Sequence, residues 1–289
     1  MTTIVKQFKA FLYQVGYSEG TQKTLPALVS EFTDHQQITD ISYVEQEKVK
    51  QFYQYLHERP LKKRAGALSE MMIQHYMYAL KTFFSWLEIT EQIDYNPISG
   101  MKFKRARQNV REPLTIEEIN QLFEAAMTLK ETALLHIFYS CGLRRSEGEV
   151  LNISDIHFKQ QLLYVREGKG AKRRVIPMTE KVTAALEEYY LQERTGSTVK
   201  KVKDQEAFIL NRTGNRMNGD QCNSLLKSLI EKSGISKPEI SLHHLRHSIA
   251  THLLQSGMSM EYVRDFLGHS FLETTQIYAK PKAEQLKLL

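Results

Sequence analysis

The sequence predicts a mainly α-helical protein with a small β-hairpin or sheet, built as an N-terminal helical domain followed by an α+β domain. Apolar residues recur at three- and four-residue steps through the first hundred residues, which is the helical period. Further along, QLLYVRE and RRVIP alternate in polarity on either side of the turn-forming GKGAK, as the strands of a hairpin do. A basic segment with a proline near each end separates the two regions.

The N-terminal helices follow from periodicity and capping. Ile4, Phe8 and Phe11 recur at helical steps, and MMIQHYMYALKTFFSWLEI predicts the longest helix, with Ser69 as its N-cap. Pro26 lies inside a periodic stretch, where we expect it to kink or end the helix. The aromatic residues of the longest helix are expected in the core rather than stacked on bases; they are Tyr76, Phe83, Phe84 and Trp86.

The domain boundary is expected near 105–113, because MKFKRARQNVR holds five cations and no acid. This divides the chain into a helical domain at 1–105, a basic linker at 106–112 and an α+β domain at 113–289. Thr115 and Glu118 have the spacing of a capping box that opens the second domain. Its helices are expected near 116–128, 133–141, 179–194, 218–233, 243–256, 259–267 and 271–278.

Composition narrows the class of protein. The 289 residues are 42% hydrophobic, too many for a disordered chain, and no apolar run reaches the length of a membrane span. The charged N-terminus does not resemble a secretory signal, and two cysteines make no disulfide framework, so we expect a cytoplasmic protein. The net charge is +6, and the basic runs at 101–111 and 166–174 favour a polyanionic partner; a solvated face or tether is the alternative.

Several basic residues fit a reaction at a phosphodiester. Charge building on the non-bridging oxygens is best neutralised by arginine, whose planar fork binds two oxygens at once. Arg144 and Arg246 are the candidates for this clamp. Lys169, in the turn of the predicted hairpin, is the candidate donor of a proton to a leaving alkoxide.

The remaining candidates are two imidazoles and a phenol. His243 and His269 can add hydrogen bonds or move protons near neutral pH. Tyr278 is the candidate nucleophile, whose covalent phosphoester would divide one difficult step into two. A phenol has a pKa of about 10, so nearby cations and a base must activate it.

Metal and nucleotide chemistry fit the sequence poorly. His243 and His247 have the i, i+4 spacing of zinc ligands, but His244 stands in the place of a metalloprotease glutamate and Arg246 lies between the two. Neither cysteine has a CxxC partner, and no GxxxxGK[ST] loop is present. The sequence therefore predicts a reaction without metal, cofactor or ATP.

Taken in order, these motifs resemble the tyrosine recombinases of the phage integrase family, in particular the Xer-type and mobile-element integrases. The resemblance rests on SCGLRRSE, REGKGAKRRVIPM, SLHHLRHSIATHLLQSG, FLGHS and TTQIYAK. It implies that the catalytic residues are Arg144, Lys169, His243, Arg246, His269 and Tyr278, with Glu147 supporting the first arginine.

The resemblance also implies an activity and partners. The activity is site-specific cutting and rejoining of DNA strands through a 3′-phosphotyrosyl bond, by four protomers on two double-stranded DNA sites, with accessory DNA-bending proteins. It implies that the N-terminal region is a core-binding, SAM-like domain that clamps DNA together with the catalytic domain. The expected DNA-binding residues are Lys102, Lys104, Arg105, Arg107, Arg173 and Arg174. The alternatives are a DNA-binding protein without catalysis, a type IB topoisomerase-like relaxase, and an RNA- or protein-binding adaptor.

Three features depart from the family pattern. Gly148 replaces an apolar helix residue, which is expected to weaken the helix and loosen Glu147. Pro26 lies in a helix that is normally free of proline. The tail after Tyr278 allows barely two helical turns, so docking of Leu286, Leu288 and Leu289 into a neighbouring subunit stays open.

Overall fold

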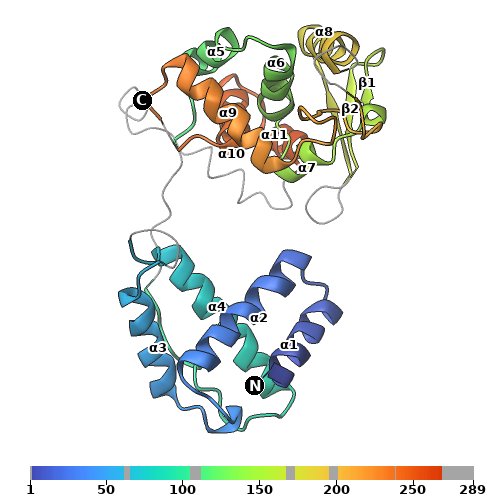
Figure 1. Ribbon diagram of the computed structural model, residues 1–289. Coiled ribbons are helices and arrows are strands. Elements are labelled where there is room, and N and C mark those ends of the chain that lie inside the picture. Colours follow the sequence, from blue (N-terminus) through green and yellow to red (C-terminus); the bar gives the residue numbers. More distant parts are fainter. Residues whose placement is uncertain are drawn as a thin grey trace. The chain divides into compact units, whose positions relative to one another are not determined.

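The computed structural model describes residues 2–61, 66–104, 112–166, 173–194, 201–237 and 239–268 (Figure 1). The chain divides into two compact units, Met1–Asn109 and Val110–Leu289. The division lies inside the segment for which the sequence predicts a linker. The helices expected at 271–278 and in the C-terminal tail lie outside the described residues.

The first unit is helical. Its helices are α1 (Thr2–Gln14), α2 (Glu19–His35), α3 (Gln46–Glu58) and α4 (Glu70–Ile89), with a 3-10 turn at Ile41–Tyr43. Ser69 caps α4 as predicted, because its side chain accepts a hydrogen bond from the Met72 N–H. The four aromatic residues of α4 named above are buried in the core, which confirms that prediction. Helix α2 does not end at Pro26 but runs through it to His35.

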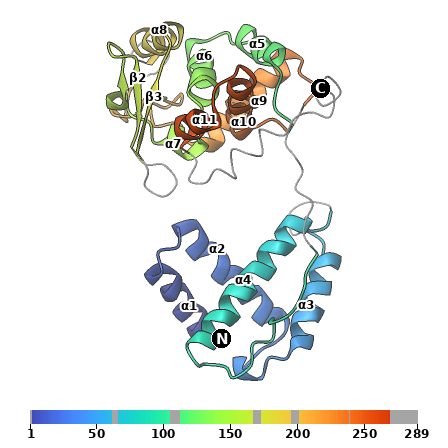
Figure 2. The same cartoon turned by 180° about the vertical axis from the view of Figure 1, so that it is seen from behind.

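The second unit packs helices around a small sheet. Its α-helices are α5 (Ile116–Glu124), α6 (Leu129–Leu135), α7 (Arg145–Glu149), α8 (Glu180–Glu188), α9 (Gly219–Ser233), α10 (Leu242–Gln255) and α11 (Met260–Leu267). The antiparallel sheet has the order β1-β2-β3, with β1 at Ile156–His157, β2 at Leu162–Val165 and β3 at Arg174–Pro177. The sheet and α8 lie at one end of the unit and α5 at the other (Figures 1 and 2).

Within the described residues, the helices and the hairpin that the sequence predicts for this unit are present, and some of them differ in where they end. The Thr115–Glu118 capping box and the β2–β3 hairpin are confirmed. The helix expected at 116–128 ends at Glu124, and the two helices expected at 133–141 and 179–194 finish in π-helical turns at His136–Ser140 and Tyr189–Arg194. A 3-10 turn at Ile153–Asp155 leads into β1, the strand that the polarity pattern did not reveal.

Gly148 makes a close approach possible rather than weakening the site. A Cβ at this position would lie 2.5 Å from Cε1 of Phe138, a core residue with no exposed surface. Glu147 beside it is 3% exposed and is held by ion pairs to arginines. The expectation that Gly148 loosens Glu147 is therefore wrong, because the glycine lets α7 pack directly on the Phe138 ring.

The start of the second unit is anchored to α10, the helix that carries Arg246. The Leu114 N–H donates to Ser248 Oγ at 2.8 Å, and the Leu114 carbonyl lies 2.9 Å from His252 Nε2. His252 Nδ1 lies 2.9 Å from the hydroxyl of Tyr139, in the π-turn before Arg144. Leu114 is thus fixed to α10. Through His252, α10 also contacts the π-turn that precedes Arg144.

We expect His136 to make the stability of the second unit depend on pH. Burial lowers its pKa to about 4, and Lys181 adds to this. The folded state keeps the imidazole neutral, so its stabilising effect is complete above the unfolded pKa of about 6.5 and is lost as the pH falls toward 4. At pH 4 the loss amounts to roughly 3 kcal/mol. Thermal melts of His136→Gln should show a flatter pH dependence in this window, whereas exposed His157→Gln should match wild type. Equal slopes for all three proteins would contradict the assignment.

Among the described helices, none is both long and apolar enough to cross a membrane.

Candidate active site

Arg144 lies at the N-terminus of α7, directly after a turn. Gly142 holds that turn at φ +59°, a conformation that suits glycine. The Arg144 guanidinium donates from Nη1 to Glu147 Oε1 at 2.6 Å and from Nη2 to the Gly268 carbonyl at 2.6 Å. Its backbone N–H also donates to Glu147 Oε2, at 2.8 Å. Glu147 therefore binds both the backbone and the side chain of Arg144.

Arg246 reaches the same place from α10. Its side chain is 5% exposed, with Nη1 donating to the Gly142 carbonyl and Nη2 donating to the Leu267 carbonyl at 2.5 Å. The Nη1 atom lies 3.8 Å from Glu147 Oε2. The two arginines that the sequence places a hundred residues apart therefore share one carboxylate.

A third arginine completes the cluster. Arg174, the first residue of β3, donates from Nη1 and Nη2 to the two oxygens of Glu147 at 2.9 and 2.8 Å, and from Nε to the Phe266 carbonyl at 2.9 Å. Its side chain is 8% exposed. The sequence predicts Arg174 as a DNA-binding residue of a basic run, and the structure places its guanidinium against Glu147 rather than on a solvated surface. We call Arg144, Arg174, Arg246 and Glu147 the arginine cluster.

The end of α11 accepts hydrogen bonds from all three arginines. The carbonyls of Phe266, Leu267 and Gly268 are consecutive, and each binds a different arginine of the cluster. These are the unpaired carbonyls at a helix C-terminus, where the helix dipole favours cations. Figure 2 shows α11 beside α10 and α7, and α11 also contacts β3. The chain then turns at Gly268, at φ +65°, immediately before His269.

The cluster holds more positive than negative charge. Three guanidinium groups face the single carboxylate of Glu147, which leaves a net charge of +2 among these four side chains. Burial raises the pKa of Glu147, but its hydrogen bonds with Arg174 and Arg144 outweigh burial and lower the pKa to about 2. The carboxylate is thus ionised at neutral pH, and the remaining charge suits an anion such as a phosphate.

Three of the six predicted catalytic residues can be placed. Arg144 and Arg246 meet in the cluster, and His243 lies on the exposed surface of the first turn of α10, three residues before Arg246. Lys169, His269 and Tyr278 lie outside the described residues. The chain nevertheless enters the segments that carry Lys169 and His269 from β2 and from α11, beside the cluster.

The remaining predicted DNA-binding residues differ in exposure. Lys102, Lys104 and Arg173 are exposed, and the Lys104 ammonium lies 3.6 Å from Glu70 across the surface of the first unit. Arg105 and Arg107 lie outside the described residues. The exposed side chains of Lys102, Lys104 and Arg173 are accessible to a polyanion.

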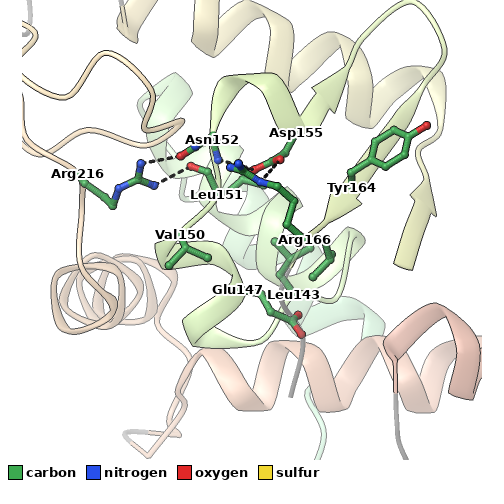
Figure 3. Close-up of a pocket in the computed structure, with 10 residues that line it drawn as sticks. Leu143, Glu147, Val150, Leu151, Asn152, Asp155, Tyr164, Arg166 and Arg216 are labelled. Carbon is green, nitrogen blue, oxygen red and sulfur yellow. Dashed lines mark hydrogen bonds and ion pairs between the residues drawn. The ribbon is translucent and has the colours of Figure 1, made fainter. Parts of the chain in front are cut away.

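A cavity of about 360 Å³ lies behind Glu147, between α7 and the β2 end of the hairpin (Figure 3). Arg166, which follows β2, points into it and binds Asp155 through Nε and Nη2, at 2.6 and 2.8 Å. Across the cavity, Arg216 Nη2 donates to the Asn152 side chain at 2.6 Å. The sequence placed Arg166 in a basic run and did not reveal that it is paired.

Among the described residues, no group of three or more His, Cys, Asp or Glu side chains is arranged to hold a metal ion. Cys141 and Cys222 are buried, and burial raises the pKa of both thiols to about 12. A thiol of such high pKa is almost wholly protonated at neutral pH and hence unreactive.

Comparisons with known proteins agree with this arrangement. The model of the phage integrase family matches residues 112–285. Tyrosine recombinase XerC 2 of Ralstonia nicotianae is 33% identical over 79% of this chain and 67% of its own length. Tyrosine recombinase XerD of Listeria innocua is 29% identical over 99% of this chain and 97% of its own. The Tn1549 transposon integrase, solved with transposon right end DNA, shares the fold with a TM-score of 0.74 at 20% identity, covering 99% of this chain and 97% of that one.

Proposed function

This chain belongs to the phage integrase family, and we propose that it is a site-specific DNA recombinase, a DNA strand transferase that works through a phosphotyrosyl bond. The observation that carries the proposal is the arginine cluster, in which Arg144 and Arg246 meet with excess positive charge. Relatives along most of the chain are named tyrosine recombinases. Buried arginines with excess charge need an anionic partner, and a DNA phosphate supplies one.

In the proposed first step, the phenolic oxygen of Tyr278 attacks the scissile phosphorus while the bond to the 5′-oxygen breaks. The phenolic proton passes to a base, and Lys169 gives a proton to the leaving 5′-oxygen. Arg144 and Arg246 bind the non-bridging oxygens, where charge develops, and His243 and His269 add hydrogen bonds. Tyr278 then carries the 3′-phosphate.

In the second step, a free 5′-hydroxyl from the partner duplex attacks the phosphotyrosine and releases Tyr278. One phosphodiester is exchanged for another through a phosphoester of similar energy, so the rejoining needs no ATP. The proposal therefore includes neither a metal ion nor a nucleotide cofactor.

The proposed assembly is a tetramer on two DNA sites in the cytoplasm, aided by accessory DNA-bending proteins. The unit at 1–105 is the proposed core-binding DNA-binding domain and 113–289 the catalytic domain, with the basic linker 106–112 between them. Lys102, Lys104, Arg105, Arg107 and Arg173 are the proposed phosphate contacts outside the active site.

A suicide-substrate assay tests the proposal. The protein is incubated with a nicked duplex whose binding site has been selected by footprinting, and a covalent protein–DNA band resistant to SDS but sensitive to protease is sought. Wild type should form the band and Tyr278→Phe should not, although both bind the duplex. If Tyr278→Phe kept the band, Tyr278 would not be the nucleophile, and Tyr262 on α11, 73% exposed, would be tested next.

The covalent-complex assay separates the alternatives when DNA binding, relaxation of supercoiled DNA and strand exchange are measured beside it. A DNA-binding protein without catalysis would bind the duplex and give no covalent band. A type IB topoisomerase-like enzyme would give the band and relax supercoiled DNA, but would not exchange strands between two duplexes. An RNA- or protein-binding adaptor would show neither binding to the duplex nor a band.

A further inference from the structure

Arg174 joins three segments that carry the proposed catalytic residues. It begins β3, where it pairs in register with Val165 of β2. Its guanidinium binds both oxygens of Glu147 on α7 and the Phe266 carbonyl on α11. A planar guanidinium that uses two edges in this way permits little rotation. The start of β3 is therefore tied to α7 and to the end of α11.

The backbone at Gly268 packs directly on this side chain. A Cβ at Gly268 would lie 2.9 Å from Cδ and 3.0 Å from Nη1 of Arg174. No larger residue fits there without moving the arginine. In the sequence, Gly268 directly precedes His269, and Arg174 follows Lys169 by five residues.

The other strand of the hairpin has a corresponding anchor. Arg166 follows β2 and binds Asp155, whose carboxylate also accepts the Asn152 N–H at 2.8 Å (Figure 3). Asp155 is 5% exposed, and the Arg166 side chain is 52% exposed. Each strand that flanks residues 167–172 is thus held by an arginine–carboxylate pair, and the pair at Arg174 belongs to the arginine cluster.

We propose that Arg174 is a positioning residue that holds the β2–β3 hairpin against the arginine cluster, so that Lys169, five residues earlier, can protonate the leaving 5′-oxygen. This inference rests on the proposed function. Arg174 acts through the hairpin rather than through the clamp, because Arg144 and Arg246 have anchors of their own. The Gly268 carbonyl holds Arg144, and the Gly142 and Leu267 carbonyls hold Arg246.

A sulfur leaving group tests which step Arg174 serves. In a duplex whose bridging 5′-oxygen at the scissile phosphate is replaced by sulfur, attack by Tyr278 breaks a P–S bond and releases a thiolate. A thiol has a pKa of about 8.5, so the thiolate leaves at neutral pH without receiving a proton. A variant defective only in protonating the leaving group should then recover its cleavage rate, whereas one defective in the clamp should not.

Arg174→Lys keeps the charge but cannot bind Glu147 and Phe266 together. We expect single-turnover cleavage of the oxygen substrate to slow by about tenfold to a hundredfold, as expected for loss of a bidentate, charge-assisted contact. On the sulfur substrate the rate should return to within about threefold of wild type. Lys169→Ala should show the same recovery. Arg145→Lys, at an arginine whose side chain is 38% exposed and pairs with Asp220, should match wild type on both substrates.

The ratio of the two rates is measured within one variant, so an unfolded fraction lowers both rates equally and cancels. Arg174→Gln repeats the test if the lysine variant does not fold. Equal slowing on both substrates, no slowing on either, or no recovery of Lys169→Ala would overturn the inference. Failure of wild type to form a covalent complex with either substrate would instead refute the proposed function.

Discussion

Replacing Arg246 by alanine is expected to lower the rate of covalent-complex formation on the order of a thousandfold, the scale seen when an arginine that stabilises a phosphoryl transition state is removed. Arg246 is buried, lies 3.8 Å from Glu147, and holds the Gly142 and Leu267 carbonyls in place. Removing the guanidinium takes away a positive charge that stabilises the transition state more than the ground state, because negative charge develops on the phosphate during the reaction. The rate is measured in single turnover with protein in excess of its DNA-binding constant.

Arg145→Ala is the matched control for this experiment. Arg145 is also an arginine of the second unit, but its side chain is 38% exposed and pairs with the exposed carboxylate of Asp220. We expect its cleavage rate to stay within about threefold of wild type, because an exposed ion pair contributes little. If more protein restored the rate of Arg246→Ala to that of wild type, Arg246 would serve DNA binding rather than the reaction.

Replacing Glu147 by alanine is expected to have the largest effect on stability. The substitution leaves three guanidinium groups around an empty position, with Arg174 and Arg246 buried. Removing one partner of a buried ion pair typically costs about 3–5 kcal/mol. For a unit of this size the loss corresponds to a fall in melting temperature of roughly 10 °C. Thermal unfolding followed by calorimetry measures it, with exposed Glu187→Ala on α8 as the control.

The same variant has an expected pH dependence. The folded pKa of Glu147 is lowered to about 2, so the carboxylate stabilises the fold fully above its ordinary value of 4.5 and progressively less as the pH falls toward 2. The stability difference between wild type and Glu147→Ala should therefore stay constant from pH 8 to about 4.5 and narrow below it. A difference that widens on acidification would contradict the ion-paired state of Glu147.

Most of the architecture could be predicted from the sequence. Helical periodicity and caps at Ser69 and Thr115 located helices in both units, and polarity alternation located the β2–β3 hairpin. The π-turns at His136–Ser140 and Tyr189–Arg194 could not be predicted, because an i+5 turn continues a helix with ordinary helical residues. The packing role of Gly148 could not be predicted either, because its partner Phe138 is identified only by tertiary packing.

The candidate site was predictable in part. The order of the motifs indicated that Arg144 and Arg246 belong to one site, and the structure brings both to Glu147. The burial of Arg174 could not be predicted from the basic run 166–174, because a count of charges does not distinguish a solvated cation from one paired with a carboxylate. The alternation of side chains along a strand could have predicted this burial. Arg174 lies on the same face of β3 as buried Ile176. Arg173 and Val175, which are exposed, lie on the other face.

The most direct test of the central claim compares a charged with a neutral scissile phosphate. Replacing one non-bridging oxygen by a methyl group removes the charge that Arg144 and Arg246 are proposed to neutralise. In the resulting double-mutant cycle, the penalty of Arg246→Ala should shrink from about a thousandfold on the phosphate to below about tenfold on the methylphosphonate. An equal penalty on both substrates would mean that the arginine cluster does not act on the phosphate charge.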